Sequence, residues 1–210
     1  MTKLVLASTS PARLRLLRDG GINPIVISPH VDEERVAEMA MAAGQISNTS
    51  DLVLLLAKAK AEAVGNNPAT RGALILGCDS ALDLDGEALG KPHEPEVAIE
   101  RWKAMRGRSG RLYTGHWLID NREPALMPPA KGKATNTTVH FANISDSEVL
   151  AYVGTGEPLK VAGAFTIDGL GGAFIKAIEG DSHTVVGLSL TTLRDLVISL
   201  GVDYPSLWRA

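Results

Sequence analysis

The residues best suited to chemistry are carboxylates that follow short apolar runs. Asp79 comes directly after the apolar run Ala73–Cys78, and a carboxylate at the end of a buried strand suits a general base or a metal ligand. The same pattern also describes an aspartate that caps a turn, and the pattern alone favours that simpler role. Asp32, Glu33 and Glu34 form an acidic turn with oxygen ligands for a divalent cation, although most such turns bind none.

Several basic residues are placed where a stiff backbone would present them to an anion. Lys91 lies at the centre of Gly90–Pro92, whose flanking residues restrict the local backbone, and it therefore suits a phosphate contact. A surface lysine in a turn is the commoner case. Arg106, Arg108 and Arg111 form a glycine-spaced basic loop, which is either a phosphate clamp or solvated charge.

The N-terminal segment has the pattern of a strand that leads directly into a helix. Leu4–Ala7 is a short apolar run, and Ser10 suits the N-cap of a helix over Pro11–Asp19. Free backbone N–H groups at such a helix start favour anions, and Arg13 adds a guanidinium that can bind a phosphate. An ordinary strand–helix junction explains the stretch equally well.

Strand and helix patterns alternate along the first half of the chain, and strands dominate the second half. The remaining predicted helices are Asp51–Val64, Glu94–Met105, Ser145–Val153 with a capping box, and Ser189–Leu200. The remaining predicted strands are Ile25–Ser28, Ala73–Cys78, a hairpin over Leu82–Leu89, Arg111–Asp120, Lys133–Phe141, Ala164–Ile167 and Phe174–Ile178. This order predicts an α/β fold with one long, mixed, twisted sheet flanked by helices. We expect a single domain over residues 1–210, with two lobes and a central cleft.

The helix predicted over Asp51–Val64 carries two lysines of interest. Lys58 and Lys60 lie on nearly opposite sides of this helix, so at most one of them faces a given site. The helix has one apolar face, formed by Leu52, Leu55, Leu56, Ala59 and Ala63.

Composition excludes several classes of protein. A net charge of −3 argues against a broad nucleic-acid surface, and 4% aromatic residues argue against stacking of single strands. The longest apolar run, Leu52–Ala57, is far too short to cross a membrane. Cys78 is the single cysteine and is expected to be a buried strand residue; its solitude rules out an internal disulfide and fits a reducing cytoplasm.

The residue patterns of two kinds of catalytic site, a zinc site and a serine hydrolase site, are also missing from the sequence. The five histidines show no metal-ligand spacing, which argues against a zinc site. Ser8 and Ser10 have no nearby histidine or aspartate in the arrangement of a serine hydrolase.

Taken together, these pieces resemble the Maf family of nucleoside triphosphate pyrophosphatases, once described as septum-formation inhibitors. The resemblance runs from Leu4 to about Leu200 in the family's order. Its motifs here are Leu6–Pro11 with Arg13 and Leu16–Leu17, Val31–Glu33, Leu56–Ala57 through Lys60–Ala61, Leu76–Ser80, Gly90–Pro92, Tyr113–Gly115, Tyr152–Val153, Gly156–Leu159, Ala162–Phe165, Gly169–Gly171 and Val185–Leu188. The family's α/β fold is shared in outline with inosine triphosphatases, with the site in the cleft between lobes.

The resemblance implies hydrolysis between the α- and β-phosphates of a nucleoside triphosphate, giving a monophosphate and pyrophosphate. Asp79 would be the general base that activates water, and Glu33 with Asp79 would hold Mg²⁺ or Mn²⁺. The triphosphate would be bound by Ser8, Arg13, Lys60 and Lys91.

Three departures from the family pattern bear on the base of the nucleotide. Members that prefer thymidine or uridine triphosphates carry Arg, Thr and Gln where this chain has Ala12, Ser80 and Asp168. An acidic residue at the third position resembles the branch that acts on 7-methylguanosine triphosphate. A carboxylate only accepts hydrogen bonds, and guanine offers two adjacent donors at N1 and N2. The sequence therefore predicts a guanine-type base, unless Asp168 only caps its glycine-rich turn.

Two other functions stay open at this point. One is a nucleotide-binding regulator of cell division with little turnover; the other is a pyrophosphatase for inosine or xanthosine triphosphate. We expect a cytoplasmic protein whose partner is its nucleotide substrate, with no nucleic acid and no membrane. The oligomeric state is open, with a homodimer as one arrangement.

Overall fold

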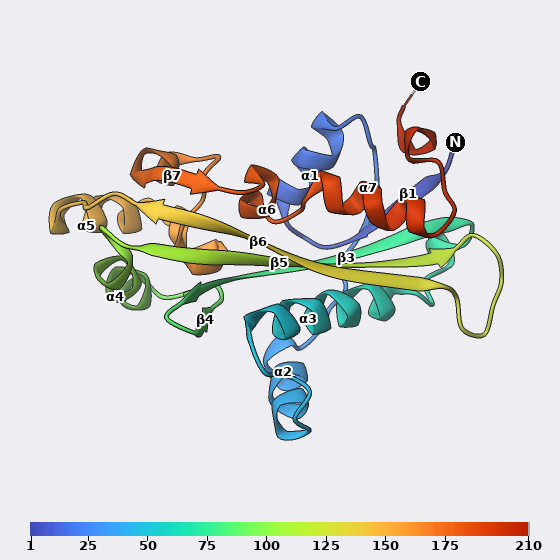
Figure 1. Ribbon diagram of the computed structural model, residues 1–210, viewed down its shortest axis with the longest axis horizontal. Coiled ribbons are helices and arrows are strands. Elements are labelled where there is room, and N and C mark those ends of the chain that lie inside the picture. Colours follow the sequence, from blue (N-terminus) through green and yellow to red (C-terminus); the bar gives the residue numbers. More distant parts are fainter. Residues whose placement is uncertain (210) are drawn as a thin grey trace. The chain divides into compact units, whose positions relative to one another are not determined.

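A seven-stranded sheet flanked by helices organises the computed structural model, which describes residues 1–209 (Figure 1). The strand order is β2-β1-β3-β5-β6-β7, with β4 paired to β3. The strands are β1 (Lys3–Ala7), β2 (Ile25–Ile27), β3 (Ala73–Leu84), β4 (Glu87–Leu89), β5 (Ser109–Asn121), β6 (Ala130–Phe141) and β7 (Ile175–Glu179). The helices are α1 (Pro11–Asp19), α2 (Glu33–Ala42), α3 (Thr49–Val64), α4 (Pro95–Met105), α5 (Asp146–Gly154), α6 (Ser182–Val186) and α7 (Leu190–Ser199).

The sheet is mixed, as predicted. Strand β1 pairs in parallel with β2 and β3, whereas β3–β4 and β6–β7 are antiparallel pairs. The hairpin prediction is also confirmed, because β3 turns into β4 through Asp85 and Gly86, which both have positive φ. Prediction and structure agree as well on α1 with Ser10 at its N-cap, and on the capping box of Ser145 and Glu148.

The chain divides into two compact units. The first comprises Met1–Asp79, Thr114–Thr135 and the described residues from Gly187 onward; the second comprises Ser80–Tyr113 and Asn136–Val186. Strands β3, β5 and β6 contribute residues to both units. The expectations of a single domain and of a cleft between lobes stay predictions.

In the first unit, alternate residues of β1 and β3 face two separate apolar clusters. Leu4, Leu6, Leu74, Leu76 and Cys78 belong to a cluster with residues of α1 and α7. The intervening residues, Val5, Ala7, Ala73 and Ile75, pack with Ala61 and Val64 of α3. Helices α1 and α7 therefore cover one face of these strands and α3 covers the other, as Figure 1 shows.

The buried face of α3 differs from the apolar face in its sequence. Of the five residues that form the apolar face in the sequence, only Leu56 is buried. The buried residues of α3 are Thr49, Val53, Leu56, Ala57, Lys60, Ala61 and Val64. The cause is a close backbone approach to β3 at Gly77. A Cβ atom at Gly77 would lie 2.1 Å from the Ala57 carbonyl oxygen and 2.8 Å from the Ala61 nitrogen. Small residues, rather than the leucines at positions 52 and 55, must therefore turn toward the sheet.

Other sequence predictions need correction. The acidic residues after β2 do not form an isolated turn: Asp32 is the N-cap of α2, a helix that the sequence analysis did not predict. Strand β3 continues to Leu84, so Asp79 lies inside a strand rather than after one. Ala164–Ile167 is not a strand, because a short 3₁₀ turn (η3, Ala162–Ala164) ends there with Ala164 at positive φ.

The second unit has its own core around the indole of Trp102. Its ring makes edge-on contacts with Phe141, Tyr152 and Phe174, and its Nε1 donates to the Ala164 carbonyl at 2.8 Å. In the same unit, Arg106 and Arg108 form ion pairs with Asp146 and Asp85, two partners within the protein itself.

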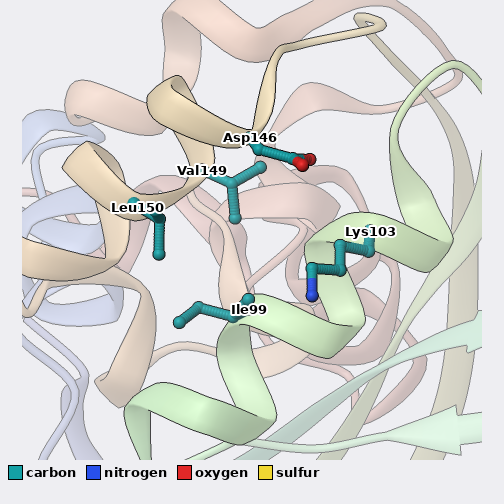
Figure 2. Close-up of a pocket in the computed structure, with 5 residues that line it drawn as sticks. All are labelled: Ile99, Lys103, Asp146, Val149 and Leu150. Atoms are coloured by element: carbon teal, nitrogen blue, oxygen red, sulfur yellow. The ribbon is translucent and has the colours of Figure 1, made fainter.

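A small pocket between α4 and α5 lies in this second unit (Figure 2). It is lined by Ile99, Lys103, Asp146, Val149 and Leu150, none of which the sequence analysis singled out for chemistry. Among the described residues, no helix has both the length and the apolar character needed to cross a membrane.

Gly77→Ala tests the close approach of α3 to β3. We expect this variant to lose about 3 kcal/mol or more of unfolding free energy, because the added methyl group meets backbone atoms that cannot move aside locally. Urea denaturation measures the change. Gly154→Ala is the matched control, since a Cβ there meets nothing within 4 Å, and its stability should stay within about 1 kcal/mol of the parent. Equal stability of both variants would contradict the packing argument.

Candidate functional site

A lysine ammonium bound by two carboxylates is the most chemically distinctive feature of the first unit. Lys60 Nζ lies 2.6 Å from Asp79 Oδ1 and 2.9 Å from Glu33 Oε1. Lys60 and Asp79 are buried, each with 7% of its surface exposed, whereas the Glu33 side chain is half exposed. The three residues come from α3, β3 and the first turn of α2, so this charge cluster joins three elements.

The backbone explains why these side chains meet. Asp79 lies two residues after Gly77 and therefore points to the same face of β3, where α3 packs closely. The parallel pairing of β1 with β3 ends at Ala7 and Gly77, so Asp79 lies just beyond the carboxyl end of β1. The prediction that Asp79 follows the end of its own strand is wrong, because β3 continues to Leu84.

Burial governs the protonation of Asp79. Removal from water raises the pKa of Asp79 above its ordinary range, and the negative charge of Glu33 acts in the same direction. The positive charges of Lys60 and Arg13 oppose this rise, as does the hydrogen bond from Lys60. A carboxylate with a raised pKa is a stronger base than one on the surface, which suits proton transfer near neutral pH.

Arg13 is held against the strand that carries Asp79. Its Nε donates to the Gly187 carbonyl at 2.7 Å, and its Nη1 donates to the Cys78 carbonyl at 2.9 Å and to Ser8 Oγ at 3.3 Å. These acceptors fix the plane of the guanidinium. The structure therefore brings Ser8, Arg13, Lys60, Glu33 and Asp79 together within the first unit.

Cys78 is buried, as predicted for a strand residue, and burial raises the pKa of its thiol to about 11. The thiol is therefore protonated at neutral pH. Its backbone carbonyl, however, orients Arg13, as does the carbonyl of Gly187. Sequence analysis missed both contacts because every residue type offers a backbone carbonyl, and no pattern of side chains marks the ones that are used.

The carboxylates also fit a divalent cation. Glu33 and Asp79 present hard oxygen donors that converge on one positive charge, the Lys60 ammonium. Mg²⁺ is commonly held by one or two carboxylates together with substrate phosphates and water, and Glu33 and Asp79 are carboxylates of this kind. In residues 1–209, no cluster of three or more His, Cys, Asp or Glu side chains suits a metal ion.

Three other predicted residues belong to the second unit. Lys91 is exposed, and the preceding Gly90 carbonyl accepts from Arg101 Nη1 at 2.6 Å and from the Gly163 N–H at 3.0 Å. Ser80 follows Asp79 in β3 and so points to the opposite face of that strand. Asp168 is exposed and accepts a hydrogen bond from Thr166 Oγ1. Ala12 lies in the first turn of α1, in the first unit.

Sequence comparison places the chain in a known family, since residues 3–200 match the family described as Maf-like protein. The chain belongs to the Maf family. It is 51% identical to a nucleoside triphosphate pyrophosphatase of Leifsonia xyli subsp. xyli, covering 98% of this chain and 96% of the relative. Proteins of the same name from Streptomyces avermitilis and Nostoc punctiforme are 49% and 47% identical, each over 98% of this chain and over 94% and 97% of their own lengths.

Among solved structures, the Ham1 protein of Staphylococcus aureus is similar with a TM-score of 0.38 and 15% identity, covering 68% of this chain and 73% of that one. So low a TM-score does not establish a common fold. The family assignment rests on the sequence matches.

Lys60→Met tests whether the ammonium stabilises the buried carboxylate. We expect a loss of about 3 kcal/mol of unfolding free energy at pH 8, because Asp79 keeps its burial but loses its partner. Without Lys60 the pKa of Asp79 rises further, so the folded state binds a proton that the unfolded state releases. The loss should therefore shrink as pH falls toward 5. Chemical denaturation across this pH range measures both effects.

Lys58→Met is the matched control, because Lys58 lies on the exposed side of the same helix and contacts Glu62 and Trp117. Its cost should be about 1 kcal/mol or less, with little dependence on pH. A Lys60→Met loss that is constant from pH 5 to pH 8 would contradict the role given to Asp79.

Proposed function

We propose that this Maf-family protein is a nucleoside triphosphate pyrophosphatase, which cleaves the bond between the α- and β-phosphates. The observation that carries the proposal is the buried Asp79 carboxylate, which is bound by Lys60. Arg13 donates a hydrogen bond to the backbone carbonyl of the preceding residue, Cys78. A base with a raised pKa beside fixed positive charge suits attack by water on a phosphoanhydride. The named pyrophosphatases at 47–51% identity over nearly the whole chain support this activity.

Asp79 acts as the general base in this proposal. Its carboxylate accepts a proton from water as the water oxygen bonds to the α-phosphorus. The bond from the α-phosphorus to the bridging oxygen breaks, and pyrophosphate leaves with that oxygen and the bonding electrons. Lys60 keeps the Asp79 side chain in place and adds positive charge where negative charge develops.

Basic and hydroxyl groups bind the triphosphate. The Arg13 guanidinium donates a hydrogen bond to Ser8 Oγ just after the end of β1, and both side chains are proposed phosphate contacts. Backbone N–H groups at the start of α1 also favour anions. Lys91, on its anchored loop in the second unit, is proposed as a further phosphate contact.

A divalent cation, Mg²⁺ or Mn²⁺, would be held by Glu33 and Asp79. When bound, it would neutralise phosphate charge that the protein's own cations leave uncompensated.

We further propose that the base is of the guanine type, with 7-methylguanine as a candidate. Asp168 is exposed and only accepts hydrogen bonds when ionised, which matches the adjacent N1 and N2 donors of guanine. Thymine and uracil present one donor between two carbonyls, which a carboxylate disfavours. Ala12 and Ser80 are the other two positions at which the substrate is selected in this proposal.

Asp79→Asn tests the catalytic role. An amide cannot accept the proton of water at neutral pH, so we expect kcat to fall by at least about 100-fold. Pyrophosphate release is measured for wild type and variant over a panel of nucleoside triphosphates. Asp83→Asn on the same strand is the control: its carboxylate accepts from the Gly86 N–H in the hairpin, a bond that asparagine retains. If wild type releases pyrophosphate from no nucleotide, a binding regulator replaces the enzyme as the better reading.

Asp168→Asn tests the choice of base. We expect the ratio of kcat/KM for GTP to that for dTTP to fall about tenfold, because an asparagine amide opposes one of the two guanine donors. Steady-state kinetics on GTP, 7-methyl-GTP, UTP and dTTP measure the ratio. A wild type that already prefers dTTP and UTP would contradict the guanine proposal and leave the general activity intact.

A further inference from the structure

A glutamate carboxylate lies at the centre of the glycine-rich loop that follows Asp168. Glu157 Oε2 accepts from the Leu170 N–H at 3.0 Å, and Oε1 accepts from the Gly171 N–H at 2.9 Å and from the Tyr152 hydroxyl at 2.9 Å. Both carboxylate oxygens therefore bind the loop, and all of these residues belong to the second unit. None of the proposed catalytic or phosphate contacts uses Glu157.

The glycines of this loop are explained by the same carboxylate. A Cβ at Gly169 would lie 2.5 Å from Glu157 Oε2, and a Cβ at Gly171 would lie 2.3 Å from the Tyr152 hydroxyl oxygen. The backbone can wrap around the Glu157–Tyr152 pair only where side chains are absent. The loop is thus built around this pair.

The Glu157–Tyr152 pair is anchored to the core. Tyr152 is 3% exposed, and its ring packs edge-on against Trp102 and Phe174 at centroid distances of 5.5 Å and 5.3 Å. Burial alone would raise the pKa of Glu157, but hydrogen bonds from Gly171, Leu170 and Tyr152 outweigh it and lower that pKa below its ordinary value. Glu157 is therefore ionised at neutral pH and stays an acceptor for all three donors.

Asp168 is separated by one residue, Gly169, from the part of the loop that Glu157 binds. Its own backbone N–H and side chain contact Thr166 Oγ1, so the residue is held on both of its flanks. The Asp168 carboxylate is held directly by Thr166, and the backbone that begins two residues later, at Leu170, is held by Glu157. Asp168 and the backbone that Glu157 binds are thus consecutive parts of one hydrogen-bonded loop.

We propose that Glu157 is a positioning residue for base selection, which holds the loop so that Asp168 meets the donor edge of the base. This inference rests on the proposed selection of a guanine-type base by Asp168. It assigns to Glu157 no contact with substrate and no part in the cleavage step.

Glu157→Gln tests the inference, because glutamine keeps the size of the side chain but faces one loop N–H with its own amide N–H. We expect the GTP-to-dTTP ratio of kcat/KM to fall about tenfold, as for Asp168→Asn. Combining Glu157→Gln with Asp168→Asn should lower the ratio no further than Asp168→Asn alone, since both act through one carboxylate. Glu148→Gln is the matched control: Glu148 also accepts from backbone and side chain, but at the N-terminus of α5, and its ratio should stay unchanged.

The outcomes separate the two proposals. If Asp168→Asn leaves the ratio unchanged, the guanine proposal fails and the role of Glu157 fails with it, whereas pyrophosphate release tests cleavage independently. If Asp168→Asn lowers the ratio but Glu157→Gln lowers kcat/KM equally for every nucleotide, Glu157 is structural and only this inference is overturned. Additive effects in the double variant overturn it as well.

Tyr152→Phe keeps the test decisive if Glu157→Gln does not fold. It retains the aromatic packing and removes only the hydroxyl that donates to Glu157. We expect a smaller fall of the GTP-to-dTTP ratio, in the same direction. The inference would be overturned if Asp168→Asn lowers the GTP-to-dTTP ratio of kcat/KM and a folded Tyr152→Phe variant leaves that ratio unchanged.

Discussion

Lys60 carries a positive charge at a position where only 7% of the residue is exposed, and water cannot compensate that charge. Asp79 and Glu33 compensate it instead, which fixes the separations of α3, β3 and the start of α2 at once. Such a pair adds little net stability, because desolvation offsets much of the attraction, but loss of one member leaves an expensive uncompensated charge. The cluster therefore constrains the structure more than it stabilises it. The same desolvation raises the pKa of Asp79, so positioning and basicity have one physical origin.

In both units, glycines allow a backbone segment to come close to a charged side chain. In the first unit, missing side chains let α3 approach β3, and Gly77 makes room for the backbone that delivers Lys60 to Asp79. In the second unit, missing side chains let a loop close around Glu157, which is itself held by a core tyrosine. In each case the glycines do no chemistry. They let a backbone segment come close enough for a charged side chain to be fixed by short hydrogen bonds.

The sequence predicts elements whose signals are local. Ser10 and Pro11 start a helix because capping depends on a few adjacent residues, and Asp85–Gly86 turns a hairpin for the same reason. The buried face of α3 could not be predicted from its apolar residues, since Gly77, on a different strand, decides which residues meet the sheet. The charge cluster was predicted only as separate members of a family pattern. Its geometry depends on burial, which periodicity does not reveal for a lysine such as Lys60.

The contact between Arg13 and Gly187 has a consequence for how the protein is made. The two residues are 174 positions apart, while Ser8, Glu33, Lys60 and Asp79 all lie in the first 79 residues. During synthesis the acidic and lysine side chains emerge, with the Cys78 carbonyl that binds Arg13 Nη1, long before the Gly187 carbonyl that binds Arg13 Nε. A contact of such long sequence separation has a high entropic cost of loop closure. A nascent chain that has not reached Gly187 thus carries Asp79, Glu33 and Lys60 without one of the carbonyls that orient the Arg13 guanidinium.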